Sequence, residues 1–248
     1  MSYAAQALCF LGVRLCFYFL GRENFMHYRS VLEARFIERP NRFVAYVELP
    51  RGRELVHVKN TGRCRELLVP GRRVSLARAE GNSRKTRYDL VAVEKPGLGW
   101  VNIDSQAPNQ VVREWLAGQE GISLLKPEYK YGRSRVDFYL EYAGRRALME
   151  VKGCTLEVAG VGYFPDAPTA RGVKHLQELA GAVGQGYDCF LAFVIAMPGV
   201  WEVRPNLATH PEFGEALAMA REAGVRVLYL PCTVGPAELS ISGCILAD

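Results

Sequence analysis

The segment Lys126–Gly153 constrains the fold more than any other part of this 248-residue chain. It contains two strand-like runs, Val136–Tyr142 and Arg145–Lys152, which are separated only by Ala143-Gly144. Such a dipeptide can form a two-residue hairpin loop, so the two runs are expected to pair as antiparallel strands. Because folding about this loop gives each strand residue one partner, the sequence also predicts which side chains share a face of the sheet.

The two faces of this predicted hairpin differ in kind. One is apolar throughout and is expected to be core; it consists of Val136, Phe138, Leu140, Ala147, Met149 and Val151. The other carries Asp137 directly opposite Glu150, with Lys152 two residues further along. Two opposed carboxylates repel each other, and a cation between them removes that repulsion. Carboxylates completed by water suit Mg²⁺ or Mn²⁺, so a metal site is predicted; the alternative is a surface ion pair of Lys152, which stabilises a fold very little.

Asp137 together with Glu150-Val151-Lys152 matches the D…(D/E)-x-K signature of the PD-(D/E)xK nuclease superfamily, although Val136 stands in place of the proline. In such a site the metal lowers the pKa of a water molecule and neutralises charge on the phosphate, while the lysine assists the attack. The pattern therefore predicts a metal-dependent phosphodiesterase. Asp137, Glu150 and the Val151 carbonyl are the expected metal ligands, and Lys152 is the expected catalytic cation.

A helix is expected after the hairpin. Thr169 is a suitable N-cap, and the helix should continue to about Val183. One arc of this helix is apolar and consists of Val173, Leu176, Leu179, Ala180 and Val183, whereas the opposite arc carries Arg171, Lys174, His175 and Glu178. We expect Arg171, Lys174 and His175 to meet substrate phosphates; the alternative for His175 is a plain solvent-exposed position.

The rest of the C-terminal half predicts a scaffold of alternating strands and helices. Cys189–Ala196 and Val225–Leu230 are continuous apolar runs, which suit strands buried on both faces. Pro211–Ala223 and the shorter Val111–Gly118 are expected to be helices. Residues 106–248 are therefore expected to form an α/β domain, with helices packed on a mixed sheet.

The N-terminal half instead shows short β-rich runs broken by turn residues. Phe43–Leu49 and Glu54–Val58 are expected to form a hairpin with a four-residue loop, and Leu67–Val69, Arg73–Leu76 and Tyr88–Val93 to be further strands. About five short strands within residues 26–105 favour an OB-like β-barrel.

The same segment is basic, with 16 Lys and Arg against 9 Asp and Glu in residues 26–105, whereas residues 106–248 have 13 against 16. A basic surface favours a polyanionic partner such as nucleic acid. The candidates for phosphate contact are Arg63, Arg65, Arg72, Arg73, Arg84, Lys85 and Arg87. The alternative is a solvated basic face. Phe43, beside Arg42, is expected to belong to the core.

Residues 1–25 differ from the rest of the chain. The apolar stretch Ala4–Leu20 has the length of a membrane span, but Arg14 at its centre costs about 2.5–3.5 kcal/mol on insertion. No basic residue precedes the stretch, as a secretory signal would require. We expect translation from an upstream start codon, with Met26 as the natural start, or an added amphipathic helix. A membrane anchor is the least favoured alternative, and no membrane partner is expected.

The overall composition, with 49% hydrophobic and 23% charged residues, is that of a globular protein and excludes a disordered or collagen-like chain. The seven cysteines are odd in number and form no C-x-x-C pair, which argues against a disulfide framework and structural zinc. Free thiols indicate a reducing compartment, so the chain is expected to be cytoplasmic.

Four motifs resemble the sugar fermentation stimulation protein A family. They are HVKNTGRCRELLVPG (His57–Gly71), YKYGRSRVDF (Tyr129–Phe138), MEVKG (Met149–Gly153) and GYFPDAPTARGVKHLQEL (Gly162–Leu179). The resemblance covers about residues 28–240 and leaves residues 1–25 without a counterpart. It implies an OB-like N-terminal domain and a restriction-endonuclease-like C-terminal domain, together DNA-binding.

The resemblance also leaves alternatives open. Glu128, within the second motif, is a further candidate acidic site residue. The favoured function is a DNA-binding protein with a metal-dependent nuclease site. The alternative is a non-catalytic regulator of sugar (maltose) metabolism genes that uses the nuclease fold as a clamp. The oligomeric state is not fixed, and a homodimer is one alternative.

Overall fold

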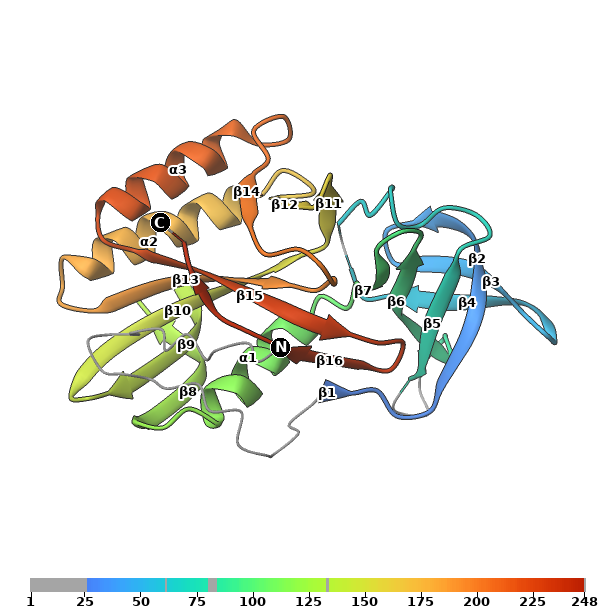
Figure 1. Ribbon diagram of the computed structural model, residues 1–248, viewed down its shortest axis with the longest axis horizontal. Coiled ribbons are helices and arrows are strands. Elements are labelled where there is room, and N and C mark those ends of the chain that lie inside the picture. The colour runs from blue at the N-terminus through green and yellow to red at the C-terminus, as the bar shows by residue number, and fades with distance from the viewer. Residues whose placement is uncertain (1–25, 61, 80–83, 133, 248) are drawn as a thin grey trace, which may run out of the picture.

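The computed structural model describes residues 26–60, 62–79, 84–132 and 134–247. They form two units built on sheets, which lie side by side (Figure 1). The hypotheses about residues 1–25 fall outside the described residues. Within the described ranges, no helix is both long and apolar enough to cross a membrane.

The smaller unit is a β-barrel. Its strands are β2 (Val31–Asn41), β3 (Val44–Leu49), β4 (Gly52–Val58), β5 (Arg73–Arg78), β6 (Tyr88–Lys95) and β7 (Gly99–Asn102). The sheet has the order β4-β3-β2-β5-β6-β7, and a parallel contact between β4 and β6, with His57 opposite Asp89, closes it. The OB-like barrel predicted from the sequence is thus confirmed.

Two local predictions for the barrel are wrong. Leu49 pairs with Gly52, so the hairpin loop has the two residues Pro50-Arg51 rather than four; Gly52, at φ +110°, allows the tighter turn. Leu67–Val69 is not a strand: the chain turns at residues 65–67, and the N–H groups of Leu67 and Leu68 both bond back to the carbonyl of Cys64. Strand β2, the longest of the barrel, was not predicted, since exposed Leu32 and Glu33 interrupt its alternation.

The larger unit is a mixed sheet with the order β1-β16-β15-β13-β10-β9-β8, and β17 pairs with β15. These strands are β1 (Met26–His27), β8 (Ile122–Tyr131), β9 (Ser134–Tyr142), β10 (Arg145–Cys154), β13 (Asp188–Ile195), β15 (Arg226–Val234), β16 (Glu238–Ile241) and β17 (Ile245–Leu246). Its helices are α1 (Ala107–Ala117), α2 (Ala170–Val183) and α3 (Pro211–Glu222). A small separate sheet contains β11 (Leu156–Val158), β12 (Val161–Phe164) and β14 (Val203–Pro205). The mixed α/β domain predicted from the sequence is confirmed.

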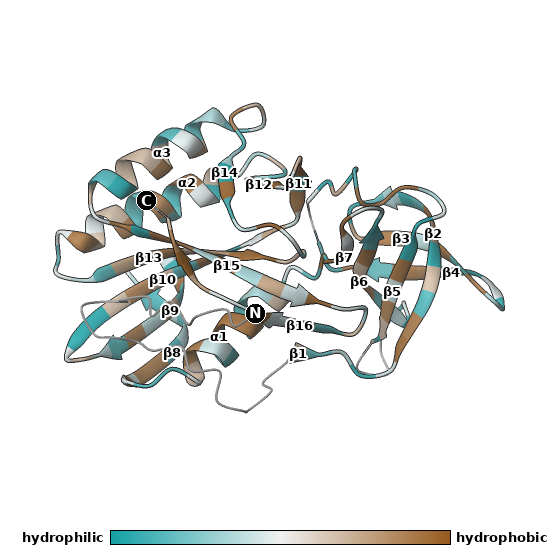
Figure 2. Ribbon diagram, in the orientation of Figure 1, coloured by the Kyte–Doolittle hydropathy of each residue, from teal (hydrophilic) through white to brown (hydrophobic). Residues whose placement is uncertain are grey.

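Helices cover both faces of the larger sheet. On one face Leu148 of β10 belongs to the same core as Leu176 of α2 and Phe213 of α3. On the other face Met149 packs in a core with Val112 of α1. Alternate residues of β10 therefore face different helices, which explains the continuous apolar runs of its neighbours β13 and β15 (Figure 2).

The predicted hairpin forms with the predicted register. Tyr142 pairs with Arg145, and the ladder runs as far as Phe138 opposite Met149. Ala143 and Gly144 both have positive φ, at 47° and 73°, as a two-residue loop of this kind requires.

The face assignment needs two corrections. Val136 packs with the core under α2 and α3, unlike the other five predicted apolar residues, which pack with the core under α1. The opposite face, which carries Glu150, is covered by α2, so Glu150 is buried and its ion pair with Lys152 does not lie on the surface, as the alternative had it.

Polar contacts join the two units. Met26 of β1 pairs with Leu239 of the larger sheet, before the chain enters the barrel. Lys59 of the barrel donates to Asp104 at 2.7 Å, at the start of the segment that leads into α1. The N–H of Cys64 donates to the Asp166 carboxylate at 2.9 Å, three residues before the N-cap of α2. The barrel thus contacts both segments that lead into α1 and α2.

Candidate active site

Asp137 lies on β9 just beyond the last paired residue of the β9–β10 ladder. Its Oδ2 accepts a hydrogen bond of 2.7 Å from the N–H of Val151, and its Oδ1 accepts one of 2.7 Å from Nδ2 of Asn109. The side chain thus bonds the backbone of β10 where the two strands cease to pair. Two donors on different elements hold this carboxylate in one orientation.

Asn109 reaches Asp137 because α1 begins close to β10. A Cβ on Gly153 would lie 2.8 Å from Cγ of Pro108, so this position must lack a side chain for the two elements to approach. Asn109 was not predicted as a site residue, because the helix was expected to begin at Val111. Pro108 was the available signal, since proline is common in the first turn of a helix.

Glu150 is buried, with 2% of its surface exposed. Its Oε1 accepts a hydrogen bond of 2.5 Å from Nζ of Lys152 and a short one from Nδ1 of His175 on α2. Arg171 donates from Nε to the other ring nitrogen of His175 at 3.2 Å, so the ring proton belongs on Nδ1. The second oxygen of Glu150, Oε2, is buried and has no hydrogen-bond partner among the described residues.

The surroundings shift the pKa values of the two carboxyl groups in opposite directions. Burial raises the pKa of Asp137, and the negative charge of Glu150 raises it further. Burial also acts on Glu150, but the hydrogen bonds from His175 and Lys152 outweigh it and lower the pKa of that carboxyl. Glu150 is therefore the firmly ionised member of the pair, and Asp137 bears most of the cost of two negative charges in one site.

These donors fit a small divalent cation. In the part of the chain that the structure describes, no three His, Cys, Asp or Glu side chains converge on a common point, so a metal would depend on two carboxylates completed by backbone carbonyl and water. Mg²⁺ and Mn²⁺ accept such oxygen ligands. Oε2 of Glu150 is a buried carboxylate oxygen without a hydrogen-bond partner among the described residues, and a cation could bind to it.

Glu128, the third predicted acidic site residue, has different surroundings. It is exposed, it has a positive φ of 51°, and its carboxylate lies 3.9 Å from the guanidinium of Arg135. The β8–β9 pairing, with Tyr129 opposite Val136 and Pro127 opposite Phe138, brings its backbone level with Asp137. The structure thus places Glu128 on the neighbouring strand, with its side chain directed to Arg135.

The basic residues of the barrel divide into those with ionic partners and those without. Arg84 makes a two-pronged contact with the Asp89 carboxylate, at 2.5 and 2.9 Å. Arg73 lies between the carboxylates of Glu33 and Glu94, at 2.7 and 2.9 Å. Both arginines are therefore largely neutralised by the barrel itself.

Arg72 is also engaged, since it donates to the backbone carbonyls of Glu66 and Leu67. The remaining four predicted phosphate contacts are exposed and form no ion pair within the described ranges: Arg63, Arg65, Lys85 and Arg87. These four keep their charge available for a polyanion.

Helix α2 has the predicted N-cap, since the Thr169 hydroxyl accepts from the N–H of Gly172 at 3.1 Å. Arg171 and Lys174 are exposed as expected. Both interpretations of His175, phosphate contact and a plain solvent-exposed position, place it at the surface, but its side chain is 8% exposed and contacts Glu150. The helical wheel places this residue on the polar side correctly, but it cannot show that a buried carboxylate lies beneath that side.

Comparison with known proteins agrees with this architecture. The family profile for the sugar fermentation stimulation protein RE domain matches residues 106–238, and that for the SfsA N-terminal OB domain matches residues 37–103. The sugar fermentation stimulation protein homolog of Desulfitobacterium hafniense is 49% identical over 211 residues, which are 84% of this chain and 92% of the relative. The Clostridium beijerinckii homolog is 47% identical over 219 residues, which are 87% and 96% of the two chains.

Among solved structures, Pyrococcus furiosus SfsA in complex with Ca²⁺ is similar, with a TM-score of 0.77 and 30% sequence identity. The match covers 89% of this chain and 96% of that chain. The fold is thus that of a two-domain protein in which an OB barrel is joined to a restriction-endonuclease-like domain. The chain belongs to the sugar fermentation stimulation protein family, which confirms the resemblance of its motifs.

Proposed function

We propose that this protein binds DNA and hydrolyses its phosphodiester bonds with a divalent metal ion at Asp137 and Glu150. The observation that carries the proposal is the buried Glu150 carboxylate, with the half-buried Asp137 carboxylate and Lys152 beside it and one Glu150 oxygen left without a hydrogen-bond partner among the described residues. The Ca²⁺ in the complex of the Pyrococcus furiosus relative supports a divalent ion in this family. Mg²⁺ or Mn²⁺ is the proposed working ion for this chain.

Each side chain has a distinct part in this proposal. Asp137 and Glu150, with the Val151 carbonyl, would hold the ion, which supplies Lewis acidity that favours ionisation of the attacking water and neutralises charge on the phosphate. Asn109 holds Asp137 in place, and His175 holds Glu150. Lys152, 16% exposed at its side chain, can turn its ammonium toward the phosphate as negative charge develops there.

The alternative function is a DNA-binding regulator of sugar metabolism genes in which the same fold acts as a clamp without cleavage. The support for this alternative is the printed family name, sugar fermentation stimulation protein, which links the family to sugar metabolism. Under it, the ion pair between Lys152 and Glu150 would be structural only.

Incubation of the protein with labelled single- and double-stranded DNA distinguishes the two functions. Mg²⁺, Mn²⁺ or EDTA is added in separate reactions, and labelled RNA is run in parallel. Cleavage that requires the metal, and that is lost in Asp137→Asn, supports the nuclease. Retention of DNA without cleavage in any metal supports the clamp and contradicts hydrolysis at this site.

A further inference from the structure

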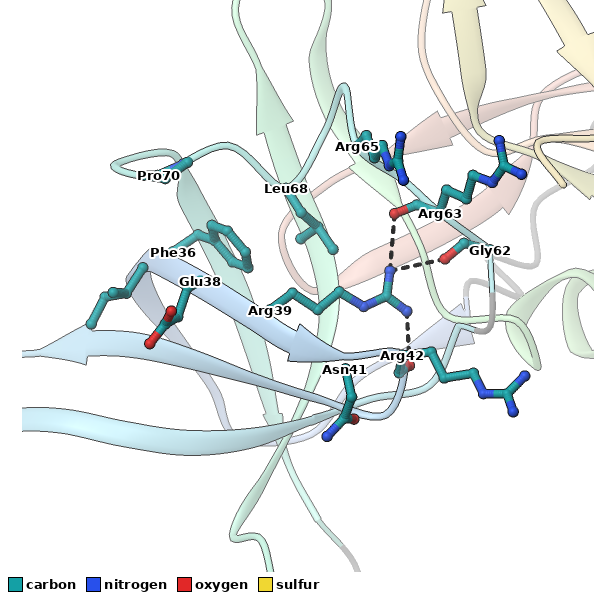
Figure 3. A pocket seen from close by; sticks show the side chains of 11 residues that line it. Phe36, Glu38, Arg39, Asn41, Arg42, Gly62, Arg63, Arg65, Leu68 and Pro70 are labelled. Carbon is teal, nitrogen blue, oxygen red and sulfur yellow. Dashed lines mark hydrogen bonds between the residues drawn. The ribbon is translucent and has the colours of Figure 1, made fainter.

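The barrel contains a hollow of about 540 Å³ that none of the foregoing functions uses (Figure 3). It lies between the turn that joins β2 to β3 and the loop Gly62–Pro70. Its apolar walls are formed by Phe36, Ile37, Leu68 and Pro70. Its cationic edge is formed by Arg42, Arg63 and Arg65, all of which are exposed; Glu38 also lines the hollow, and its carboxylate is paired with Arg53. An apolar hollow bordered by cations suits a ligand with a flat apolar part and attached anions.

The walls of this hollow are fixed by Arg39. Its guanidinium donates to the carbonyl of Arg42 at 2.8 Å on one side, and to those of Gly62 at 2.9 Å and Arg63 at 3.1 Å on the other. Figure 3 shows these bonds crossing from one wall to the other. Asp166, which belongs to the restriction-endonuclease-like domain, accepts a hydrogen bond from the N–H of Cys64 and so holds the same barrel loop. The hollow is therefore preformed, so binding has little ordering cost to overcome.

The three cations at the edge have no ionic partner. Within the ranges that the structure covers, Arg42, Arg63 and Arg65 form no ion pair, in contrast to Arg73 and Arg84 of the same barrel. Three cations of the barrel that have no ion pair within those ranges thus lie together at one hollow, which Lys85 and Arg87 do not line, and a polyanion gains by binding where several such charges meet.

An exposed aromatic ring lies beside the hollow. Phe43 is 51% exposed, so the expectation that placed it in the core is wrong, and the guanidinium of Arg42 lies 5.1 Å from its ring centre. Exposed aromatic rings between cations are the usual platforms for unstacked bases, whereas the bases of a duplex are already stacked and paired.

We infer that the hollow is a binding site for a single-stranded segment of nucleic acid. One base lies in the hollow against Leu68 and Pro70, its flanking phosphates contact Arg63 and Arg65, and the neighbouring base stacks on Phe43. The inference rests on the DNA binding in the proposed function and specifies which form of DNA is held, and where.

The test measures binding without cleavage. An Asp137→Asn protein in EDTA is titrated against a fluorescent oligothymidine strand of about 12 nucleotides, and against the same strand in a duplex, by anisotropy at several salt concentrations. We expect the single strand to bind more tightly than the duplex. Arg63→Ala/Arg65→Ala should weaken that binding about tenfold or more and reduce the salt slope by about 1.4, because each phosphate contact to a single strand contributes about 0.7.

Two further sets of substitutions test whether the hollow, rather than the total charge of the protein, accounts for single-strand binding. Arg73→Ala/Arg204→Ala removes the same amount of charge, but from arginines paired with Glu94 and Glu202, and should change binding much less. Phe43→Ala should weaken single-strand binding with an unchanged salt slope, and Phe43→Trp should restore it.

Tighter binding of the duplex, or equal effects of the two double substitutions, would overturn the site while leaving DNA binding intact. Failure of the Asp137→Asn protein to bind either form would instead remove the DNA binding on which the site rests. Cleavage is measured separately on the protein with Asp137 intact, so the two failures are distinguishable.

Discussion

His175 on α2 and Glu150 on β10 are joined by a buried hydrogen bond between residues 25 positions apart in the chain. The bond fixes the first turns of α2 over the strand that carries the acidic site. It also occupies Oε1 of Glu150 and leaves Oε2 as the oxygen free to accept a ligand. Helix α2, which was expected to contact the substrate, therefore also holds the Glu150 carboxylate in place.

Substituting His175 tests this positioning role. His175→Ala should lower the free energy of unfolding by about 2 kcal/mol, because a buried carboxylate loses one of its hydrogen bonds. If the protein cleaves DNA, kcat should fall while KM for DNA stays close to its original value. His175→Gln, which keeps a donor, should restore part of the activity. The matched substitution is Lys174→Ala on the exposed side of α2, which should raise KM instead; a rise in KM alone for His175→Ala would contradict the assignment.

Asp137→Asn should keep the fold and lose the metal. Burial and the charge of Glu150 raise the pKa of Asp137, so its ionised form destabilises the folded state at pH values above that pKa. Asparagine carries no charge, so the substitution removes this destabilisation. It also replaces one of two hydrogen-bond acceptors, at a cost of about 1 kcal/mol, so stability in EDTA should remain within about 1 kcal/mol of the original. Thermal melts with EDTA and Mn²⁺ test this expectation. No Mn²⁺-dependent shift in the unchanged protein, together with a much lower melt for Asp137→Asn, would show a structural ion pair rather than a metal site.

Lys152→Ala separates metal binding from chemistry. Glu150 keeps its hydrogen bond to His175, so the Mn²⁺-dependent rise in melting temperature should persist. Any cleavage should fall by about a hundredfold or more, because the ammonium acts on charge that develops in the transition state. Lys152→Arg is the control that retains the charge. Loss of the metal-dependent shift in Lys152→Ala would mean that the lysine organises the metal ligands instead.

The barrel should show an acid-sensitive cluster at Asp89. Burial would raise the pKa of this carboxyl, but hydrogen bonds from Arg84 and His57 outweigh it and lower the pKa. A lowered folded-state pKa contributes stability above the unfolded value of about 3.9, and this stability is lost as pH falls through the folded value. Asp89→Asn should therefore cost about 2 kcal/mol at neutral pH and much less in strong acid. Urea unfolding across this pH range tests it; a cost independent of pH would contradict the ionic explanation.

A protein shortened to begin at Met26 should fold and bind DNA as the full chain does. Met26 is buried against the larger sheet and pairs with Leu239, and Tyr28 donates to Asp104. A protein that begins at Arg29 lacks these contacts and should unfold at a clearly lower temperature. Equal melting of the two shortened proteins would show that β1 contributes nothing.

The sequence predicts those parts of the fold in which local pattern and packing agree. The Ala143-Gly144 loop fixes the hairpin register, and the N-cap at Thr169 fixes the start of α2. The burial of Glu150 could not be predicted, because alternation along β10 shows which residues share a face but not which helix covers that face. The same limit applies to His175, whose polar position on its helix fits either solvent or a buried partner.

The basic clusters show a second limit. Arg84 and Arg63 look alike in sequence, since both lie among other basic residues in a connection between strands. The fold pairs Arg84 with Asp89 on β6 but leaves Arg63 without a carboxylate partner in the described structure. Which cations remain free for a ligand is decided by the partners that folding brings to them.

The short strand β1 has a consequence for how the barrel is held. Because Met26–His27 is part of the larger sheet, the chain leaves that sheet, builds the barrel and returns to it through α1. The barrel is thus an insertion with two tethers, and its rotation about either one is restricted by the other. A DNA strand held by the barrel should accordingly reach the acidic site at one fixed offset. If the protein hydrolyses the strand that it holds, cleavage should fall at a fixed number of nucleotides from the segment bound in the barrel.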